Sequence, residues 1–135
     1  MNISEINRVI DTLKKIDIYN LKHINGEESF EKYVFKLLDA VVDKKYKLIR
    51  QTKSYKEGRQ MRPDISIGNE EVLIELKFNL KNLNDIYRLY YQAIKYSKIA
   101  SDALILCVHD PKEKLLKSDI IDLEKISKVK VIHIY

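Results

Sequence analysis

The sequence predicts a single α/β domain, residues 1–135, with a central mixed β-sheet flanked by helices. A length of 135 residues, 45% of them hydrophobic, is that of one domain able to bury one core. Segments with helical periodicity alternate with short apolar runs that are rich in β-branched residues. Only two prolines and three glycines occur, and no segment is low-complexity. No linker is therefore expected.

The first expected element is an amphipathic helix over residues 4–16. Its apolar residues recur at helical spacing, and Ser4 is a candidate N-cap. The dipeptide Asn25-Gly26 then interrupts the pattern. A second helix follows and runs to about Asp43.

Glu31 is the unusual residue of the second helix. It falls inside the arc of the apolar stripe, whereas Glu28 points away from that arc. A carboxylate on a buried stripe is costly unless it is paired or bound to a metal. We therefore expect Glu31 to face a site, and Glu27, on the same side of the helix, is a second candidate.

A first strand is expected over residues 46–51, followed by a polar loop over residues 52–60. The loop interleaves basic residues with Tyr55, a pattern that suits contact with a phosphate backbone. An ordinary solvated turn is the alternative. The basic residues that we expect to bind nucleic acid, in the loop and just after it, are Lys53, Lys56, Arg59 and Arg62.

The central prediction is a β-hairpin over residues 64–78, with Gly68-Asn69 in its loop. A two-residue loop places Asp64 opposite Leu73 and Arg62 opposite Glu75. A four-residue loop places Asp64 directly opposite Glu75. Because side chains alternate between faces, both loops put Asp64, Glu75 and Lys77 on one face. The opposite, apolar face is formed by Ile65, Ile67, Val72, Ile74, Leu76 and Phe78.

Two carboxylates beside an amine on an apolar strand pair suit a hard divalent cation. Mg²⁺ takes oxygen ligands from one or two carboxylates and completes its coordination with water and phosphate. The alternative is an exposed hairpin whose Glu75 and Lys77 are merely solvated, in a chain with 33% charged residues.

The helix expected over residues 83–100 has two apolar sides. Such a helix is typically sandwiched, here between the sheet and either the N-terminal helix or a second subunit, which favours a homodimer. Gln92 and Tyr96, four residues apart, share one face. Residues 103–109 follow as a buried strand, and residues 113–135 hold a last helix and strand.

Pro63-Asp64, Glu75-Leu76-Lys77 and Gln92 with Tyr96 together resemble the PD-(D/E)xK nuclease superfamily, the restriction-endonuclease-like fold. The last pair is similar to the QxxxY element of its RecB-like branch. The resemblance covers roughly residues 27–110, whose expected order αβββαβ matches the family core. The N-terminal helix and residues 113–135 lie outside it.

The resemblance implies a nuclease that hydrolyses DNA with Mg²⁺ or Mn²⁺ as cofactor. In that case Asp64, Glu75 and the Leu76 carbonyl bind the metal, and Lys77 handles the attacking water. Gln92 and Tyr96 support Lys77 and the phosphate, and Glu31 is the helix glutamate of the site. A non-catalytic nucleic-acid-binding or assembly module of the same fold, or an RNA-directed member, is the alternative.

Charge and cysteine content complete the expectation. A net charge of +5 favours a polyanionic partner. Cys107 is the only cysteine, so no disulfide framework is expected, and its apolar strand favours burial over nucleophilic chemistry. No apolar run reaches membrane-spanning length and no signal peptide is recognised, which predicts a cytoplasmic protein without a membrane partner.

Overall fold

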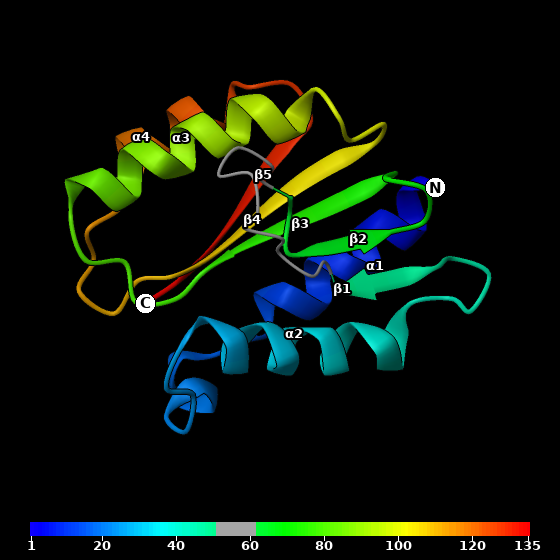
Figure 1. Ribbon diagram of the computed structural model, residues 1–135, viewed down its shortest axis with the longest axis horizontal. Coiled ribbons are helices and arrows are strands. Elements are labelled where there is room, and N and C mark those ends of the chain that lie inside the picture. Colours follow the sequence, from blue (N-terminus) through cyan, green and yellow to red (C-terminus); the bar gives the residue numbers. More distant parts are fainter. Residues whose placement is uncertain (51–61) are drawn as a thin grey trace, which may run out of the picture.

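The computed structural model shows a five-stranded sheet between two layers of helices, and it describes residues 1–50 and 62–135 (Figure 1). The elements are α1 (Ile3–Lys14), the 3₁₀ helix η1 (Ile18–Leu21), α2 (Glu27–Val41), β1 (Leu48–Arg50), β2 (Ile65–Ile67), β3 (Val72–Lys77), α3 (Leu83–Ser97), β4 (Ala103–His109), α4 (Lys117–Glu124) and β5 (Val129–Ile134). The order from α2 to β4 is the predicted αβββαβ.

The strand order in the sheet follows the chain, β1-β2-β3-β4-β5. The β1-β2 and β2-β3 pairs are antiparallel, whereas β3-β4 and β4-β5 are parallel. The predicted α/β class with a mixed sheet is therefore confirmed. The C-terminal strand β5 extends the sheet beyond β4.

The two faces of the sheet carry separate apolar cores. Buried residues of α1 and α2 pack with Ile65, Ile67, Val72, Ile74 and Leu76 on one face. Buried residues of α3 and α4 pack with Leu73 and alternate β4 residues on the other. Figure 1 shows this arrangement, with α3 and α4 above the sheet and α1 and α2 below it. The apolar face predicted for the hairpin is thus the α1–α2 face.

The register of the β2-β3 hairpin excludes the two-residue loop considered above. Ile67 pairs with Val72, so the loop has four residues, 68–71. Gly68 and Glu70 both adopt left-handed backbone conformations, with φ of 71° and 56°. The Gly68 N–H donates to the Lys47 carbonyl at 2.8 Å instead of closing a tighter turn. The contact with β1 therefore helps to fix the register.

Two expectations about helices need correction. The N-cap of α1 is Asn2, whose side chain accepts the Glu5 N–H at 2.9 Å, and Ser4 lies inside the helix. Helix α3 is not sandwiched against the N-terminal helix, because α1 packs on the opposite face of the sheet. A β3-α3-β4 crossover joins parallel neighbours over one face only. The outer side of α3 consequently remains exposed at Leu83, Tyr87, Tyr91 and Ile94.

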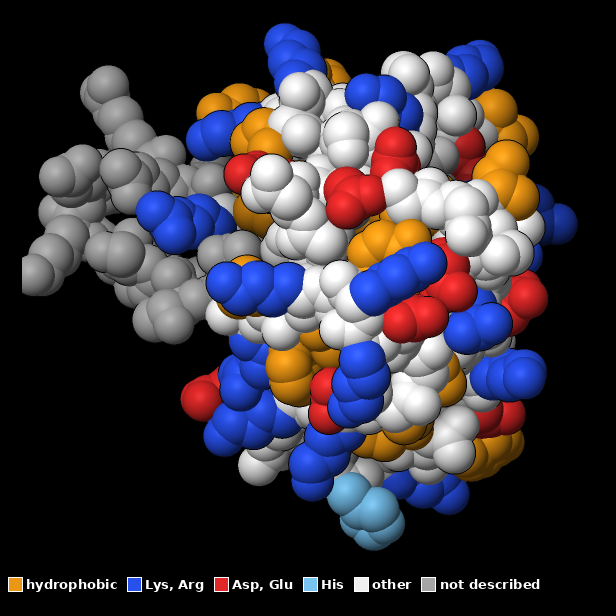
Figure 2. Space-filling view, turned by 90° about the vertical axis from the view of Figure 1, so that its right-hand side faces the viewer, with side chains coloured by type: hydrophobic (Ala, Val, Ile, Leu, Met, Phe, Trp, Pro, Cys, Tyr) orange, Lys and Arg blue, Asp and Glu red, His pale blue; other side chains and the backbone are white. Residues whose placement is uncertain are grey.

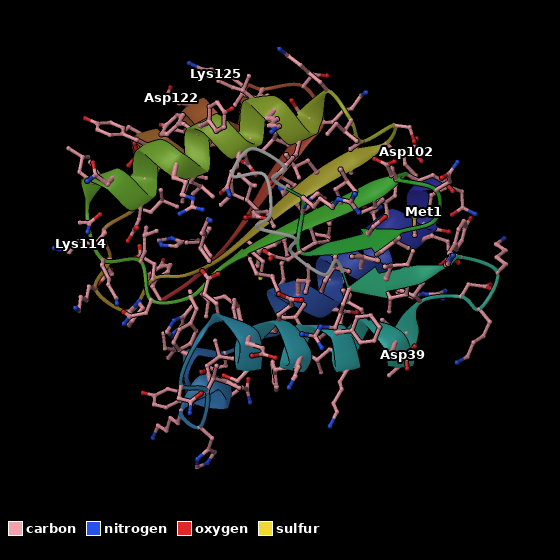
Figure 3. The ribbon with its side chains drawn as sticks, viewed as in Figure 1. Met1, Asp39, Asp102, Lys114, Asp122 and Lys125 are labelled. Carbon is pink, nitrogen blue, oxygen red and sulfur yellow. The ribbon has the colours of Figure 1, made fainter. Side chains whose placement is uncertain are left out.

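The N-terminus of α1 is tied to one end of the sheet. The Met1 amine pairs with the Glu71 carboxylate in the β2-β3 loop and with Asp102 Oδ2 at 2.9 Å, just before β4 (Figure 3). Hydrogen bonding to Glu71, and then to Asp102, raises the pKa of this amine to about 10. No helix of the described residues is long and apolar enough to span a membrane.

Candidate functional site

Asp64 and Glu75 occupy opposed positions at the end of the β2-β3 ladder. The last pair of the ladder is Ile65 with Ile74, and its continuation sets Asp64 opposite Glu75. Their exposed fractions are 1% and 0%. Because opposed residues of antiparallel strands share a face, both carboxylates project toward the layer that contains α3. Two neighbouring strands thus bring two buried carboxylates together.

The local sequence explains why the ladder ends at this point. Pro63 has no N–H to donate, and β2 begins only at Ile65. Asp64 Oδ2 accepts the Leu76 N–H at 2.7 Å, so a side chain replaces a backbone acceptor. Asp64 is therefore fixed to β3 by a charge-assisted hydrogen bond.

Lys77 completes the group predicted from the hairpin. Its Nζ lies 3.3 Å from Glu75 Oε2, and its side chain is 12% exposed. A buried carboxylate is strongly destabilising without a partner of opposite charge. The ion pair therefore both offsets part of this cost and fixes the amine beside the carboxylates. The structure brings Asp64, Glu75 and Lys77 together on one face.

Gln92 and Tyr96 lie in the same layer as the carboxylates. Both are buried on the sheet-facing side of α3, with exposed fractions of 3% and 1%. Tyr96 belongs to the apolar core that includes Leu73, whose side chain shares the Glu75 face of β3. Within the part of the chain that the structure describes, Gln92 Oε1 accepts no hydrogen bond. This buried amide oxygen is free to accept a donor in the layer.

The two helix glutamates have different surroundings. Glu31 Oε1 lies 3.1 Å from Arg50 Nε. Arg50 pairs with Ile65 and so shares the face opposite to Asp64. Glu27 Oε1 accepts the Phe78 N–H at 3.4 Å and lines one pocket with Lys77. The second candidate, Glu27, is thus the one placed beside Lys77, while Glu28 points outward as expected.

Two hollows lie along β3 on either side of Glu75, one at Leu73 and one at Lys77. A pocket of about 940 Å³ lies at the Leu73 end and has Lys45, Lys47 and Arg62 among its lining residues. A smaller pocket of about 360 Å³ lies at the Lys77 end. Figure 2 views the end of the molecule with the β2-β3 loop, where Lys and Arg side chains mix with Asp and Glu. Among the described residues in this view, the basic side chains form no uninterrupted patch.

Only part of the predicted nucleic-acid surface can be placed. Arg62 is exposed and lines the larger pocket. Lys53, Lys56 and Arg59, with Tyr55, lie outside the described residues. The sequence-based prediction of basic residues did not include Lys45 and Lys47. Their positions on either side of Tyr46 nevertheless repeat the basic-aromatic pattern by which the following loop was selected.

The donor set of the site fits a hard cation. Asp64 and Glu75 supply carboxylate oxygens from two strands, which is the ligand type that Mg²⁺ and Mn²⁺ prefer. Among the described residues, no group of three or more His, Cys, Asp and Glu side chains is arranged to hold a metal. An ion at this pair would therefore need backbone carbonyls, such as that of Leu76, and water as further ligands.

The remaining reactive side chains have structural settings. His109 Nδ1 accepts the Asn79 N–H at 2.9 Å, and its ring stacks on Phe78 with a centroid separation of 4.4 Å. His133 Nε2 lies 2.8 Å from Asp110 Oδ2. Burial raises the pKa of the Cys107 thiol to about 12, so this cysteine stays protonated at neutral pH. The two histidines thus lie near strand ends, and Cys107 packs in the apolar core within β4.

A scan against protein-family models and searches of curated proteins and of solved structures find no match for this chain. The arguments about function consequently rest on the residues and the geometry described above.

Proposed function

We propose that this protein is a metal-dependent nuclease of the PD-(D/E)xK type that hydrolyses phosphodiester bonds of DNA. The observation that carries the proposal is the register of β2 and β3. It sets Asp64 opposite Glu75, with Lys77 Nζ 3.3 Å from the Glu75 carboxylate. Two acidic oxygen donors beside one amine are the groups that metal-assisted hydrolysis of a phosphodiester needs.

Asp64, Glu75 and the Leu76 carbonyl would hold one Mg²⁺ or Mn²⁺ ion. Such an ion lowers the pKa of a bound water and offsets charge that develops on the phosphate. Lys77, held by Glu75, orients the attacking water and donates hydrogen bonds to it or to the phosphate. The Asp64–Leu76 hydrogen bond fixes one carboxylate relative to the other strand.

Residues of the helices support this group. Gln92 offers a buried amide oxygen to a hydrogen-bond donor in the α3 layer. Lys77 is a candidate donor, because its amine lies beside Glu75 on the face of β3 that this layer covers. Tyr96 is buried in the same layer. Either Glu27 or Glu31 would supply an additional acidic group from α2. Glu27 has the advantage that it lines a pocket with Lys77.

DNA is proposed as the substrate because the larger pocket presents Lys45, Lys47 and Arg62 to a polyanion. The net charge of +5 agrees with this choice. The competing function is a non-catalytic nucleic-acid-binding module. One observation favours it, namely that Asp64 and Glu75 have exposed fractions of only 1% and 0%. Catalysis requires that substrate and water reach both carboxylates.

The first prediction tests the nuclease directly. Cleavage of labelled single-stranded, duplex, flapped and four-way DNA should require Mg²⁺ or Mn²⁺ and stop in EDTA. Lys77→Ala should lower the single-turnover rate by about 10²–10⁴-fold, the usual loss when a proton-handling group is removed. Asp64→Asn and Glu75→Gln should abolish cleavage. Glu28→Gln, on the exposed side of α2, is the matched control and should be unaffected.

Circular dichroism and thermal melts must show that each variant is folded. Cleavage by folded Asp64→Asn at the wild-type rate, or activity that persists in EDTA, would contradict the proposal. Tight DNA binding without cleavage of any substrate in either metal would favour the binding module.

We further propose a homodimer through the outer side of α3. Leu83, Tyr87, Tyr91 and Ile94 are 48–61% exposed and recur at helical spacing. A standard interface buries about 800 Å² and engages about 20–30 residues on each partner, more than the four residues of this stripe. The interface would therefore extend to α4, which is linked to α3 by the Tyr90–Asp119 hydrogen bond and exposes Ile121.

A further inference from the structure

The smaller pocket gathers three cationic side chains. Lys77, Lys81 and Arg88 line it together with Glu27 and Asp85. Within the described residues, neither Lys81 nor Arg88 takes part in an ion pair. Two uncommitted cations and Lys77 therefore surround one hollow of about 360 Å³.

The two carboxylates of this pocket are already engaged by the backbone. Glu27 Oε1 accepts the Phe78 N–H at 3.4 Å. Asp85 Oδ2 accepts the Lys81 N–H at 2.8 Å and the Asn82 N–H at 3.4 Å. The N-terminus of α3 is capped by Asn82 and adds little to an anion site. The positive charge that remains for a ligand thus comes from the side chains.

The pocket is closed on one side by the chain itself. Phe78, Asn79 and Leu80 line it where the chain leaves β3. This segment is fixed to β4, because Asn79 N donates to His109 Nδ1 at 2.9 Å and Leu80 N to the His109 carbonyl at 3.1 Å. A polyanion that lies over the sheet would meet this wall and could not continue straight through it.

The pocket is also in line with the carboxylates. Leu73, Glu75 and Lys77 alternate along one face of β3, so successive side chains are about 6.6 Å apart. Leu73 lines the larger pocket, Glu75 lies between the two, and Lys77 lines the smaller one. That spacing matches the scale of neighbouring phosphates in an extended nucleic-acid strand.

We propose that the smaller pocket binds the terminal phosphate of a nucleic-acid strand, so that the adjoining phosphodiester lies at Asp64 and Glu75. A terminal phosphate carries about 1.5–2 negative charges at pH 7, more than an internal phosphodiester, and suits three cations in a pocket that is closed on one side. The inference rests on the proposed function. It adds that the protein binds a nucleic-acid strand at one terminus.

The test compares oligonucleotides of one sequence that carry a 5′-phosphate, a 3′-phosphate or only hydroxyl ends. Binding is measured without metal by fluorescence anisotropy, so that it does not depend on cleavage. One phosphorylated end should bind about tenfold more tightly than the hydroxyl ends, the scale of one charge-assisted contact. Lys81→Gln with Arg88→Gln should remove this preference. Lys36→Gln with Lys125→Gln, which removes two exposed cations elsewhere, should keep it.

The outcomes separate this inference from the nuclease proposal. A preference for one phosphorylated end that Lys81→Gln with Arg88→Gln abolishes supports the pocket, even if no substrate is ever cut. Equal binding of all ends, or an equal loss of affinity for all ends in that variant, overturns the pocket. Inorganic phosphate should displace the phosphorylated oligonucleotide but not the one with only hydroxyl ends. If it does not, the result also contradicts the proposed pocket.

Discussion

At the scale of single residues, the two helix glutamates are distinguished by their partners. Glu31 lies beside Arg50, a residue on the α1–α2 face of the sheet. Glu27 lies at the first turn of α2 and reaches the backbone at Phe78, next to Lys77. One helical turn thus separates a glutamate paired with β1 from one beside the end of β3.

The second prediction follows from these partners. Glu27→Gln should lower metal-dependent cleavage, because it removes the carboxylate of α2 that lies beside Lys77 and is proposed as an additional acidic group of the site. Glu31→Gln should chiefly lower the stability by up to about 1 kcal/mol, the range for an ion pair that is partly exposed. Single-turnover kinetics and urea unfolding of both variants provide the comparison. A larger loss of cleavage in Glu31→Gln would return the role to Glu31, as the sequence suggests.

At the scale of elements, the β2-β3 loop determines which side chains meet. A loop of four residues sets Asp64 opposite Glu75, and a change of one residue would turn one carboxylate to the other face. Gly68 is central to this loop, because its φ of 71° is a conformation that other residues avoid. An added Cβ would also meet the Glu71 carboxylate.

The third prediction concerns Gly68. Gly68→Ala should lower the free energy of unfolding by about 1–2 kcal/mol, the cost of a left-handed conformation for a residue with a Cβ. Gly26→Ser is the control, since Gly26 is an extended N-cap with open space around it and serine is favoured there. Chemical denaturation measures both. Equal stability of Gly68→Ala and wild type would show that the loop tolerates another geometry.

The outer side of α3 supplies the fourth prediction. Sedimentation at micromolar concentrations should show a species of twice the 16.0 kDa chain mass. Tyr87→Glu should dissociate it, because a charge on the exposed stripe cannot be buried at low cost. Ile3→Glu, on the 76%-exposed Ile3 of α1, should leave the dimer intact. Sedimentation of wild type only as a monomer would disprove the dimer.

At the scale of the whole molecule, His109 links stability to pH. Burial lowers its pKa below the ordinary value of 6.5, and its effect exceeds the opposing effect of Asp110. The unfolded chain therefore binds a proton at a higher pH than the folded chain does. The stability that His109 confers is present above pH 6.5 and is lost as the pH falls toward the lowered pKa.

The fifth prediction follows from this linkage. The free energy of unfolding of the wild type should decline as the pH falls from 7.5 through 6.5. His109→Asn keeps an acceptor near the Asn79 N–H and should reduce this part of the pH dependence. Urea unfolding across this pH range measures the difference. Parallel pH profiles for the two proteins would show that His109 does not contribute.

The sequence predicted much of this architecture because the patterns are local. Period-two alternation predicts Asp64, Glu75 and Lys77 on one face, and helical periodicity predicts Gln92 and Tyr96 on one face of α3, which in the structure is the buried one. The loop length was left open, because Gly68-Asn69 suits a tight turn and the hydrogen bond from Gly68 to Lys47 is a tertiary contact. The choice between Glu27 and Glu31 likewise depended on Arg50 and Phe78, which only the folded chain brings near α2.

The two-layered core has a consequence for synthesis of the chain. Helix α1 contributes Val9 and Leu13 to a cluster that also contains Ile132 and Ile134 of β5. Helix α1 is thus completed by a strand that follows the rest of this sheet in the chain. Until that strand has been synthesised, the apolar side of α1 lacks part of its cover, and transiently exposed apolar surface of this kind is prone to aggregation during folding.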